Sequence, residues 1–373
     1  MVANARILIV GGGIAGLSLH RALRDGPWQV DLVERDTRPD RVGAGLAVQP
    51  NAMRALRGLG AATAVERAGA VIHRLQYRDQ LGALLCDVDL DDLWGNVGPF
   101  VGITRAALHE ALVSESARSG MGRSASSVRQ HGERVSVTFD DGTIRTYDLV
   151  VGADGIHSSV RGSAAGRLRP AYAGQMVWRS LAPVCPGGPD GVQFWLGCDR
   201  FFGLCPAGDG ITYGFGNIAR PRLRDPVAGR KRRLIEQFTG FGAPVLEYLA
   251  AIECDGDIHC APVEWLPESA WGNGQLVLIG DAAHATSPML GQGGCMAIED
   301  ACVLADELRR CGDIPAALAR FAERRQPRVS WVREQSQALA ELVRRPAGIR
   351  DRSLRERGAG AFYHRFRPLA AAP

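Results

Sequence analysis

Three segments that lie far apart in the chain combine glycines with acidic residues in patterns that suit a nucleotide cofactor. In the first, Gly11, Gly13 and Gly16 follow a short apolar run, and Glu34 ends the next such run. These glycines allow a tight turn, close approach of a diphosphate and close helix–strand packing, while the acid can accept hydrogen bonds from a ribose diol. Taken alone, this segment fits NAD and FAD equally well.

The second and third segments each place an aspartate after an apolar run. Asp154-Gly155 and Gly280-Asp281 both follow continuous stretches of the kind that form buried parallel strands. After Asp281, a glycine-rich turn over 288–294 leads into a predicted helix that begins near Gly294. A helix N-terminus with free N–H groups stabilises negative charge on a bound group. The third segment therefore predicts an anion-stabilising turn.

The elements that must position these segments follow from the hydrophobic pattern. Residues 6–10 and 30–34 read as buried strands and residues 15–24 as a helix, which together form a βαβ unit. The next expected elements are a helix over 104–119, a hairpin of 135–139 and 144–147, and strands at 149–153 and 275–279. These buried runs predict a parallel sheet, and each glycine turn follows one of its strands.

A second kind of pattern occupies residues 172–265. Short aromatic segments alternate with Gly and Pro turns there, which predicts an antiparallel sheet, and residues 72–85 are expected to join it. After Ala301 the chain is expected to be helical to about Arg345, and an Arg-rich tail follows.

The composition is that of a globular protein with no signature of nucleic-acid binding. The 373 residues are 46% hydrophobic and 23% charged, with a formal charge of only +4. Lys231 is the single lysine, and the basic run 230–233 is expected to be a solvated helix face. The nine cysteines show no CxxC pair, which predicts reduced thiols and a cytoplasmic location, with no metal site. We expect neither a signal peptide nor a membrane span.

The motifs at 149–161 (LVVGADGIHSSVR) and 276–301 (LVLIGDAAHATSPMLGQGGCMAIEDA) are highly specific. With the first glycine turn, they make the chain resemble the single-component FAD-dependent aromatic hydroxylases, the p-hydroxybenzoate hydroxylase superfamily. The resemblance runs from residue 6 to about residue 330 and is strongest to the salicylate hydroxylase-like and urate hydroxylase-like members. It implies FAD as the cofactor and NADH or NADPH as a transient reductant.

The resemblance also implies roles for individual residues. Glu34 would bind the adenosine ribose, Arg105 and Asp154 would lie near the pyrophosphate, Asp281 would bind the ribityl chain, and the backbone of 43–52 would lie along the isoalloxazine. The full set of expected cofactor contacts is Gly11, Gly13, Ile14, Ala15, Gly16, Glu34, Arg35, Gly45, Leu46, Val48, Arg105, Val128, Asp154, Gly155, Gly280, Asp281, Pro288, Gly291, Gly293 and Gly294.

The expected fold class is α/β (α+β): a Rossmann-like FAD-binding domain, an interleaved and mostly antiparallel substrate sheet, and C-terminal helices. The expected division is 1–71, 101–170 and 269–345 for the FAD-binding domain, 72–100 and 171–268 for the substrate-binding domain, and 346–373 for the Arg-rich tail or helix. We expect a monomer or a homodimer.

The implied activity is a monooxygenase. Reduced flavin would take up O2 as a C4a-hydroperoxide, whose distal oxygen passes to an electron-rich aromatic, phenolic or heteroaromatic small molecule. Arg200, Phe202, Tyr213 and Pro288 are the expected substrate contacts, with Arg200 neutralising an acidic group and Tyr213 orienting the ring. These two, with His284, are the only catalytic candidates, and for His284 a structural or flavin-positioning role is favoured over that of a base.

Three alternatives stay open. An epoxidase or another oxidative tailoring enzyme would use the same cofactor. A flavin halogenase needs a lysine beside the substrate, and Lys231 lies in the basic run instead. A non-catalytic binding protein of this fold would not need the flavin ligands. Cys295 stands where many relatives have Asn, which questions a side-chain contact to the flavin there but leaves the backbone contacts intact.

Overall fold

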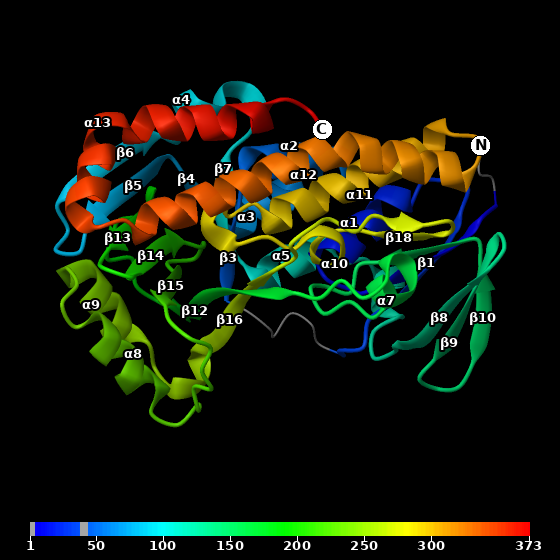
Figure 1. Cartoon of the computed structure of the whole chain (residues 1–373), viewed down its shortest axis with the longest axis horizontal. Coiled ribbons are helices and arrows are strands. Elements are labelled where there is room, and N and C mark those ends of the chain that lie inside the picture. Colours follow the sequence, from blue (N-terminus) through cyan, green and yellow to red (C-terminus); the bar gives the residue numbers. More distant parts are fainter. Residues whose placement is uncertain (1–3, 38–43) are drawn as a thin grey trace.

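The computed structural model describes residues 4–37 and 44–373, so Gly43 and the first residues of the predicted FAD-binding domain lie outside the described part. Figure 1 shows the arrangement of its elements. The central sheet has the strand order β17-β18-β11-β1-β2, and all of its pairs are parallel except that of β17 with β18. Its strands are β1 (Arg6–Val10), β2 (Gln29–Val33), β11 (Leu149–Gly152), β17 (Gly272–Asn273) and β18 (Leu276–Leu278).

Both faces of this sheet are covered. One face packs against helices α1 (Ile14–Leu23), α5 (Arg105–Leu112) and α11 (Gly293–Arg310), so that the helix following the first glycine turn lies against the helix following the third. The other face packs against a three-stranded sheet of β8 (Ala125–His131), β9 (Arg134–Phe139) and β10 (Ile144–Tyr147), and against α7 (Val160–Ala165).

The predicted helix 104–119 is two helices. After α5 the chain is extended at Val113, and α6 (Glu115–Arg118) starts again from Ser114, whose hydroxyl accepts a hydrogen bond from the Ala117 N–H. A serine offers this bond to the backbone at helix starts, and so it favours a break over a continuous helix.

The second large sheet has seven strands in the order β16-β12-β15-β14-β13-β5-β6. It contains β5 (Arg74–Asp79), β6 (Leu84–Asp89), β12 (Ala171–Ala182), β13 (Gly191–Leu196), β14 (Arg200–Pro206), β15 (Thr212–Ala219) and β16 (His259–Trp265). The prediction that residues 72–85 join this sheet is confirmed for β5 and the start of β6, whereas Ile72 belongs to a separate small sheet. β5 pairs with β13 in parallel, and the other pairs are antiparallel. Helices α8 (Arg230–Phe238) and α9 (Ala243–Ala251) cover one of its faces.

The basic run at the start of α8 has structural partners. Arg230 and Arg233 both form ion pairs with Asp225, and the Lys231 ammonium donates to the Ala250 carbonyl. Within 230–233, the expectation of a solvated face therefore holds only for Arg232, whose side chain is exposed.

A small sheet of β3 (Gly45–Val48), β7 (Phe100–Thr104) and β4 (Ala70–Ile72) connects the two large ones. The remaining helices before the C-terminal region are α2 (Pro50–Gly58), α3 (Ala62–Ala68), α4 (Leu90–Trp94) and α10 (Asp281–His284). In the described part of the chain, no helix is long and apolar enough to cross a membrane.

Two helices end the chain, the first in the region expected to be helical to about Arg345 and the second within the Arg-rich stretch expected to be a tail or helix. The long α12 (Ile314–Arg344) crosses the molecule, and α13 (Ala347–Phe366) lies over β5 and β6 (Figure 1). The buried Arg350 fixes α13 to the sheet by donating to the carbonyls of Leu196 and Gly197.

Candidate functional site

The first glycine turn has the geometry that the sequence predicts. Gly11 has φ +113°, a conformation that side chains other than glycine rarely adopt. A Cβ on Gly16 would lie 1.9 Å from the Gly11 carbonyl oxygen, so only glycine permits this packing. A Cβ on Gly13, in contrast, would point into open space at the N-terminus of α1, where no side chain of the described residues caps the helix. This open, positively polarised space suits a diphosphate.

The acid of the first unit is held in place by the backbone. The Glu34 carboxylate accepts hydrogen bonds from the N–H groups of Gly12 at 2.7 Å and Asp36 at 2.9 Å. It therefore stands fixed at the end of β2, beside the turn. Arg35 is exposed next to it, whereas Val128 lies buried in β8 and its carbonyl accepts from Ser163.

The second motif is held by its own aspartate. Asp154 accepts hydrogen bonds from the N–H of Ser159 at 2.7 Å and from that of Val160 at 3.2 Å, and so caps α7. The next residue, Gly155, has φ +78°, and a Cβ there would meet no other atom of the described residues within 4 Å, so its backbone borders open space. Arg161 then joins this motif to the third, because its guanidinium donates to the Ala282 carbonyl at 3.0 Å.

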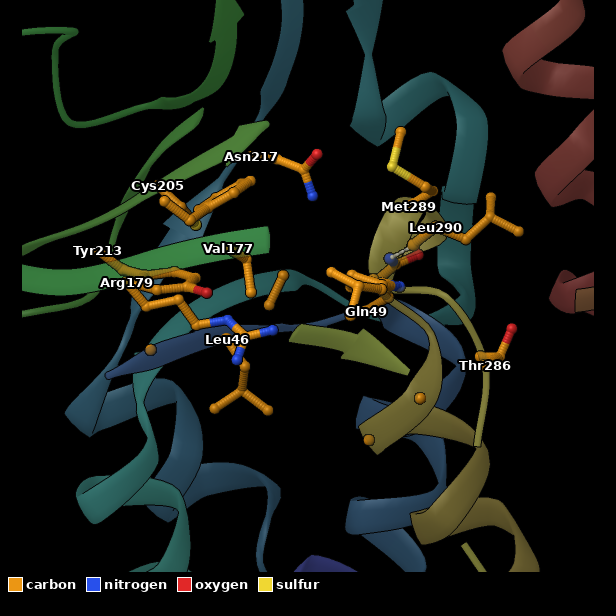
Figure 2. A pocket seen from close by; sticks show the side chains of 18 of the residues that line it. Leu46, Gln49, Val177, Arg179, Cys205, Tyr213, Asn217, Thr286, Met289 and Leu290 are labelled. Carbon is orange, nitrogen blue, oxygen red and sulfur yellow. Dashed lines mark hydrogen bonds between the residues drawn. The ribbon is translucent and has the colours of Figure 1, made fainter. Parts of the chain in front are cut away.

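The third motif is anchored by buried amides. Gln49 donates to the Leu290 carbonyl at 2.6 Å (Figure 2). Its side-chain oxygen also accepts from the Gln292 amide at 2.7 Å. These bonds fix the turn before α11, and no side chain in the described part of the chain caps the helix that begins at Gly293. Gly280 lets this motif approach the first one, since a Cβ there would lie 2.9 Å from the Ala15 Cβ.

His284 lies beneath this turn in a buried ionic cluster. Its Nε2 is 2.6 Å from Oδ2 of Asp300, which also accepts from the Gly280 N–H, while Oδ1 of Asp300 accepts from Arg325. Burial alone would raise the pKa of Asp300, but His284 and Arg325 outweigh burial and lower it. The His284 ring packs against Trp271 and is not part of the cavity wall described next.

The glycine turns and the seven-stranded sheet enclose a cavity of about 520 Å³. Many of the predicted cofactor contacts line it: Gly13, Ile14, Ala15, Gly45, Leu46, Arg105, Gly155, Asp281, Pro288, Gly291, Gly293 and Gly294. Gly11, Gly16, Glu34, Arg35, Val48, Val128, Asp154 and Gly280 lie outside its wall. Asp281 is exposed to this cavity, and desolvation among the surrounding walls raises the pKa of its carboxyl. Two uncapped helix starts, the open space at Gly13 and a polar wall fit a dinucleotide as large as FAD.

The substrate side of the cavity is one face of the seven-stranded sheet. Tyr213 lies on that face, and a Cβ on Gly45 would be 2.6 Å from the Tyr213 Cβ, so β3 passes directly against it. Burial raises the pKa of the Tyr213 phenol, and the positive charge of Arg179 opposes that rise. Figure 2 shows Arg179 and Tyr213 together at the edge of the cavity.

Arg200 and Phe202 lie on the opposite face, which corrects their expected position. Arg200 donates to the Gln237 carbonyl at 2.8 Å, and Phe202 packs edge-on against Phe238 of α8. Because side chains alternate along a strand, their neighbour Phe201 points into the cavity instead.

The sequence-based prediction missed Arg179 and Asn217. Both lie on the cavity face, on the adjacent strands β12 and β15, where Arg179 is paired with Phe215 and Val177 with Asn217. The cavity position of Asn217 could have been predicted from that of Tyr213. The two residues are four apart on the same strand, and residues an even number apart share a face. No comparable signal in the sequence marked Arg179.

Two buried cysteines lie at or near the cavity: Cys205 lines it, and Cys295 lies behind its wall. Burial raises the pKa of Cys295 to about 12 and that of Cys205 to about 12. The Cys295 thiol accepts from the Gln49 N–H at 3.5 Å, so this residue packs beneath the turn. No group of metal-ligating side chains occurs among the residues that the structure describes.

A Rossmann-like sheet whose glycine turns open into a cavity walled by an antiparallel sheet defines a flavin-dependent oxidoreductase. Residues 4–335 match the model of the FAD binding domain family, and the chain belongs to that family. It is an FAD-dependent monooxygenase of the hydroxylase class that uses NADH or NADPH as the reductant.

The chain is similar to curated and solved relatives over nearly its whole length. It is 34% identical to the aurachin C monooxygenase/isomerase of Stigmatella aurantiaca, over 86% of this chain and 85% of that one. It is also 34% identical to the 3-amino-4-hydroxybenzoate 2-monooxygenase of Streptomyces cremeus, over 92% and 89%. The crystal structure of Klebsiella pneumoniae HpxO with FAD and uric acid superimposes with a TM-score of 0.90 and 26% identity, covering 98% of this chain and 96% of that one.

Proposed function

We propose that this monooxygenase hydroxylates an electron-rich aromatic or heteroaromatic ring that carries an acidic group, with Arg179 binding that group and Tyr213 orienting the ring. The observation that carries the proposal is the position of Arg179 on the cavity face, next to Tyr213 and opposite β3. A guanidinium has five N–H donors, and the Tyr213 phenol oxygen cannot accept from all of them. The remaining donors suit a carboxylate or phenolate oxygen.

The named substrates of relatives support an acidic ring. A hydroxybenzoate appears in the name of the Streptomyces relative, and uric acid is bound in the Klebsiella structure. Both are ring compounds with an acidic group, which is what the cationic Arg179 on this face of the sheet would select.

FAD supplies the redox chemistry when it is bound, and this chain supplies position and charge. We propose that Gly13 and Arg105 contact the pyrophosphate, that Glu34 binds the adenosine ribose and Asp281 the ribityl chain, and that the remaining expected cofactor contacts act through the backbone. The uncapped start of α11 at Gly293 would stabilise negative charge on the reduced ring system. The aromatic side chains of the sheet would exclude water from the reacting atoms.

Replacing Arg179 and Tyr213 tests the assignment. We expect Arg179→Gln to raise the Kd and KM of hydroxybenzoates by about 10-fold to 100-fold, the equivalent of ~1.5–3 kcal/mol for a hydrogen bond to a charged group. Tyr213→Phe should raise peroxide release per NAD(P)H consumed, because the ring is less well oriented. The matched control is Arg200→Gln, on the other face of the same sheet.

Two outcomes would contradict the proposal. One is an Arg179→Gln enzyme with unchanged KM, and the other is a loss of affinity in Arg200→Gln as large as that in Arg179→Gln.

We further propose a cytoplasmic location, supported by nine cysteines that are all free. We also propose that residues 1–71, 101–170 and 269–345 form the FAD-binding domain and that residues 72–100 and 171–268 form the substrate-binding domain.

A further inference from the structure

The cavity is polar at one end of the seven-stranded sheet and apolar at the other. Arg179, Tyr213 and Asn217 lie on β12 and β15, next to the cofactor turns. On the strands beyond β15 the wall changes to aromatic and aliphatic side chains, among them Phe201 and Phe194. The polar groups thus occupy one end of an elongated space.

A row of aromatic rings runs along the apolar part. Tyr213 contacts Phe215 with ring centroids 5.0 Å apart, Phe215 contacts Phe194 at 5.8 Å, and Phe194 stacks on Tyr77 at 5.1 Å. Tyr77 then contacts Phe362 of α13 at 6.4 Å. From β15 to β5 this row crosses three strand spacings, about 14 Å in total.

The far end is closed by the two C-terminal helices. Leu339 and Val343 of α12 and Phe362 and Phe366 of α13 all line the cavity, and each is at most 6% exposed. Leu339 is buried and yet belongs to none of the three packed clusters of buried apolar side chains, unlike Val343. Its side chain therefore borders the open space.

We infer that the substrate carries an aliphatic tail that occupies this apolar end, the tail chamber, while its acidic ring lies at Arg179 and Tyr213. The inference rests on the proposed function for the position of the ring. The tail chamber offers water few hydrogen-bond partners, whereas a methylene chain would fill it favourably. The occupant is thus an amphipathic aromatic compound, and a compact ring leaves this part of the cavity unused.

A chain-length series tests the inference on the FAD-loaded enzyme. The probes are 2-hydroxybenzoates with a linear alkyl substituent from methyl to nonyl, and the readouts are calorimetric Kd and the change in flavin absorbance on binding. We expect affinity to rise about fourfold per methylene until the tail chamber is full. Nonan-1-ol, which has no acidic ring, should bind too and compete with the nonyl compound.

Leu339→Trp should fill the tail chamber. In this variant we expect the Kd of the methyl compound to stay unchanged, the gain with chain length to vanish and nonan-1-ol binding to be lost. Glu341→Trp is the matched control, because it introduces the same side chain at an exposed position of α12. Val343→Phe provides a second filled variant, and circular dichroism checks that each one folds.

The outcomes separate this inference from the proposed function. Affinity in the wild type that does not depend on chain length, together with no binding of nonan-1-ol, would overturn the tail chamber even if short hydroxybenzoates are hydroxylated. A Leu339→Trp protein that keeps the full chain-length gain would do the same. Binding of nonan-1-ol without any binding of hydroxybenzoates would leave the tail chamber intact and refute the acidic ring at Arg179.

Discussion

Nε2 of His284 lies 2.6 Å from Oδ2 of Asp300, and neither side chain is more than 4% exposed. The Asp300 carboxylate also forms an ion pair with Arg325, so His284 and Arg325 are both held by the same buried carboxylate. The Gly280 N–H donates to the same carboxylate, which places this cluster directly under the third glycine turn. The cluster therefore supports the cofactor site without lining it.

Removing this carboxylate charge should strongly destabilise the fold. We expect Asp300→Asn to lower the free energy of unfolding by about 3–5 kcal/mol, because it removes the charge of one of the two buried carboxylates, Asp300 and Glu299, that pair with Arg325. The measurement is urea unfolding at pH 7. Glu236→Gln, at an exposed pair with Arg232, is the control and should cost less than ~0.5 kcal/mol.

The same carboxylate should make the stability depend on pH. Since the pKa of Asp300 is lowered in the folded state, its stabilisation should be complete above the usual aspartate pKa and should be lost as the pH falls through the lowered pKa. Equal stabilities of the two variants would contradict this role.

The two glycines of the first turn should respond differently to alanine. Gly13→Ala should leave the melting temperature of the apoprotein unchanged, because its Cβ meets open space, but should weaken FAD binding at least 10-fold by filling that space. Gly16→Ala should destabilise the apoprotein itself, since its Cβ would overlap the Gly11 carbonyl. Differential scanning fluorimetry and FAD titration separate the two effects. Gly312→Ala, also in open space, is the control, and unchanged FAD affinity in Gly13→Ala would contradict the diphosphate site.

Asp281 should make the apoprotein less stable as the pH rises. Desolvation raises the pKa of its carboxyl in the folded state, so the folded protein binds the proton more tightly than the unfolded chain does. Its favourable contribution is therefore present below the unfolded pKa of about 4 and is lost as the pH rises through the raised pKa. We expect Asp281→Asn to stabilise the apoprotein at pH 7 and to weaken FAD binding. Thermal melts from pH 4 to 7 would show the difference from the wild type growing with pH, and a constant difference would argue against it.

The cysteines should fall into two reactivity groups. Cys185, Cys198 and Cys254 are exposed and should react with a thiol reagent in the native protein. Cys205 and Cys295 should not, because burial raises the pKa of each to about 12, which lowers their thiolate fraction ~10³-fold below that of an ordinary thiol. Mass spectrometry after labelling at pH 7.5, with and without urea, identifies the sites. Rapid native labelling of Cys295 would disprove its burial.

The glycine turns and parallel strands were predictable because their signals are local. Gly11, Gly13 and Gly16 must follow a strand and precede a helix for the turn to form, and the apolar runs on either side supply both elements. The same holds for Gly280 and the strand before it. Their convergence on one cavity followed from the family resemblance rather than from any periodicity.

The substrate face was not predictable in the same way. Strand β14 is apolar on both sides, because α8 and α9 cover one face and the cavity lies on the other. Alternation gives the two sets of side chains but not which set faces the cavity, so Arg200 and Phe202 were placed on the wrong side. Arg179 was missed because its cavity position depends on the long-range pairing of β12 with β15, which leaves no local signature.

The far wall of the cavity follows the last residue, 335, that matches the family model. Val343 and Phe362 come from this stretch, whereas the turns proposed to hold the flavin all precede it. The apolar wall that would select the tail is thus separable in the sequence from Arg179, Tyr213 and the cofactor turns. Exchanging α13 between homologues offers a direct route to altered selectivity with the redox machinery untouched, and evolution can retune the enzyme through the same few helical turns.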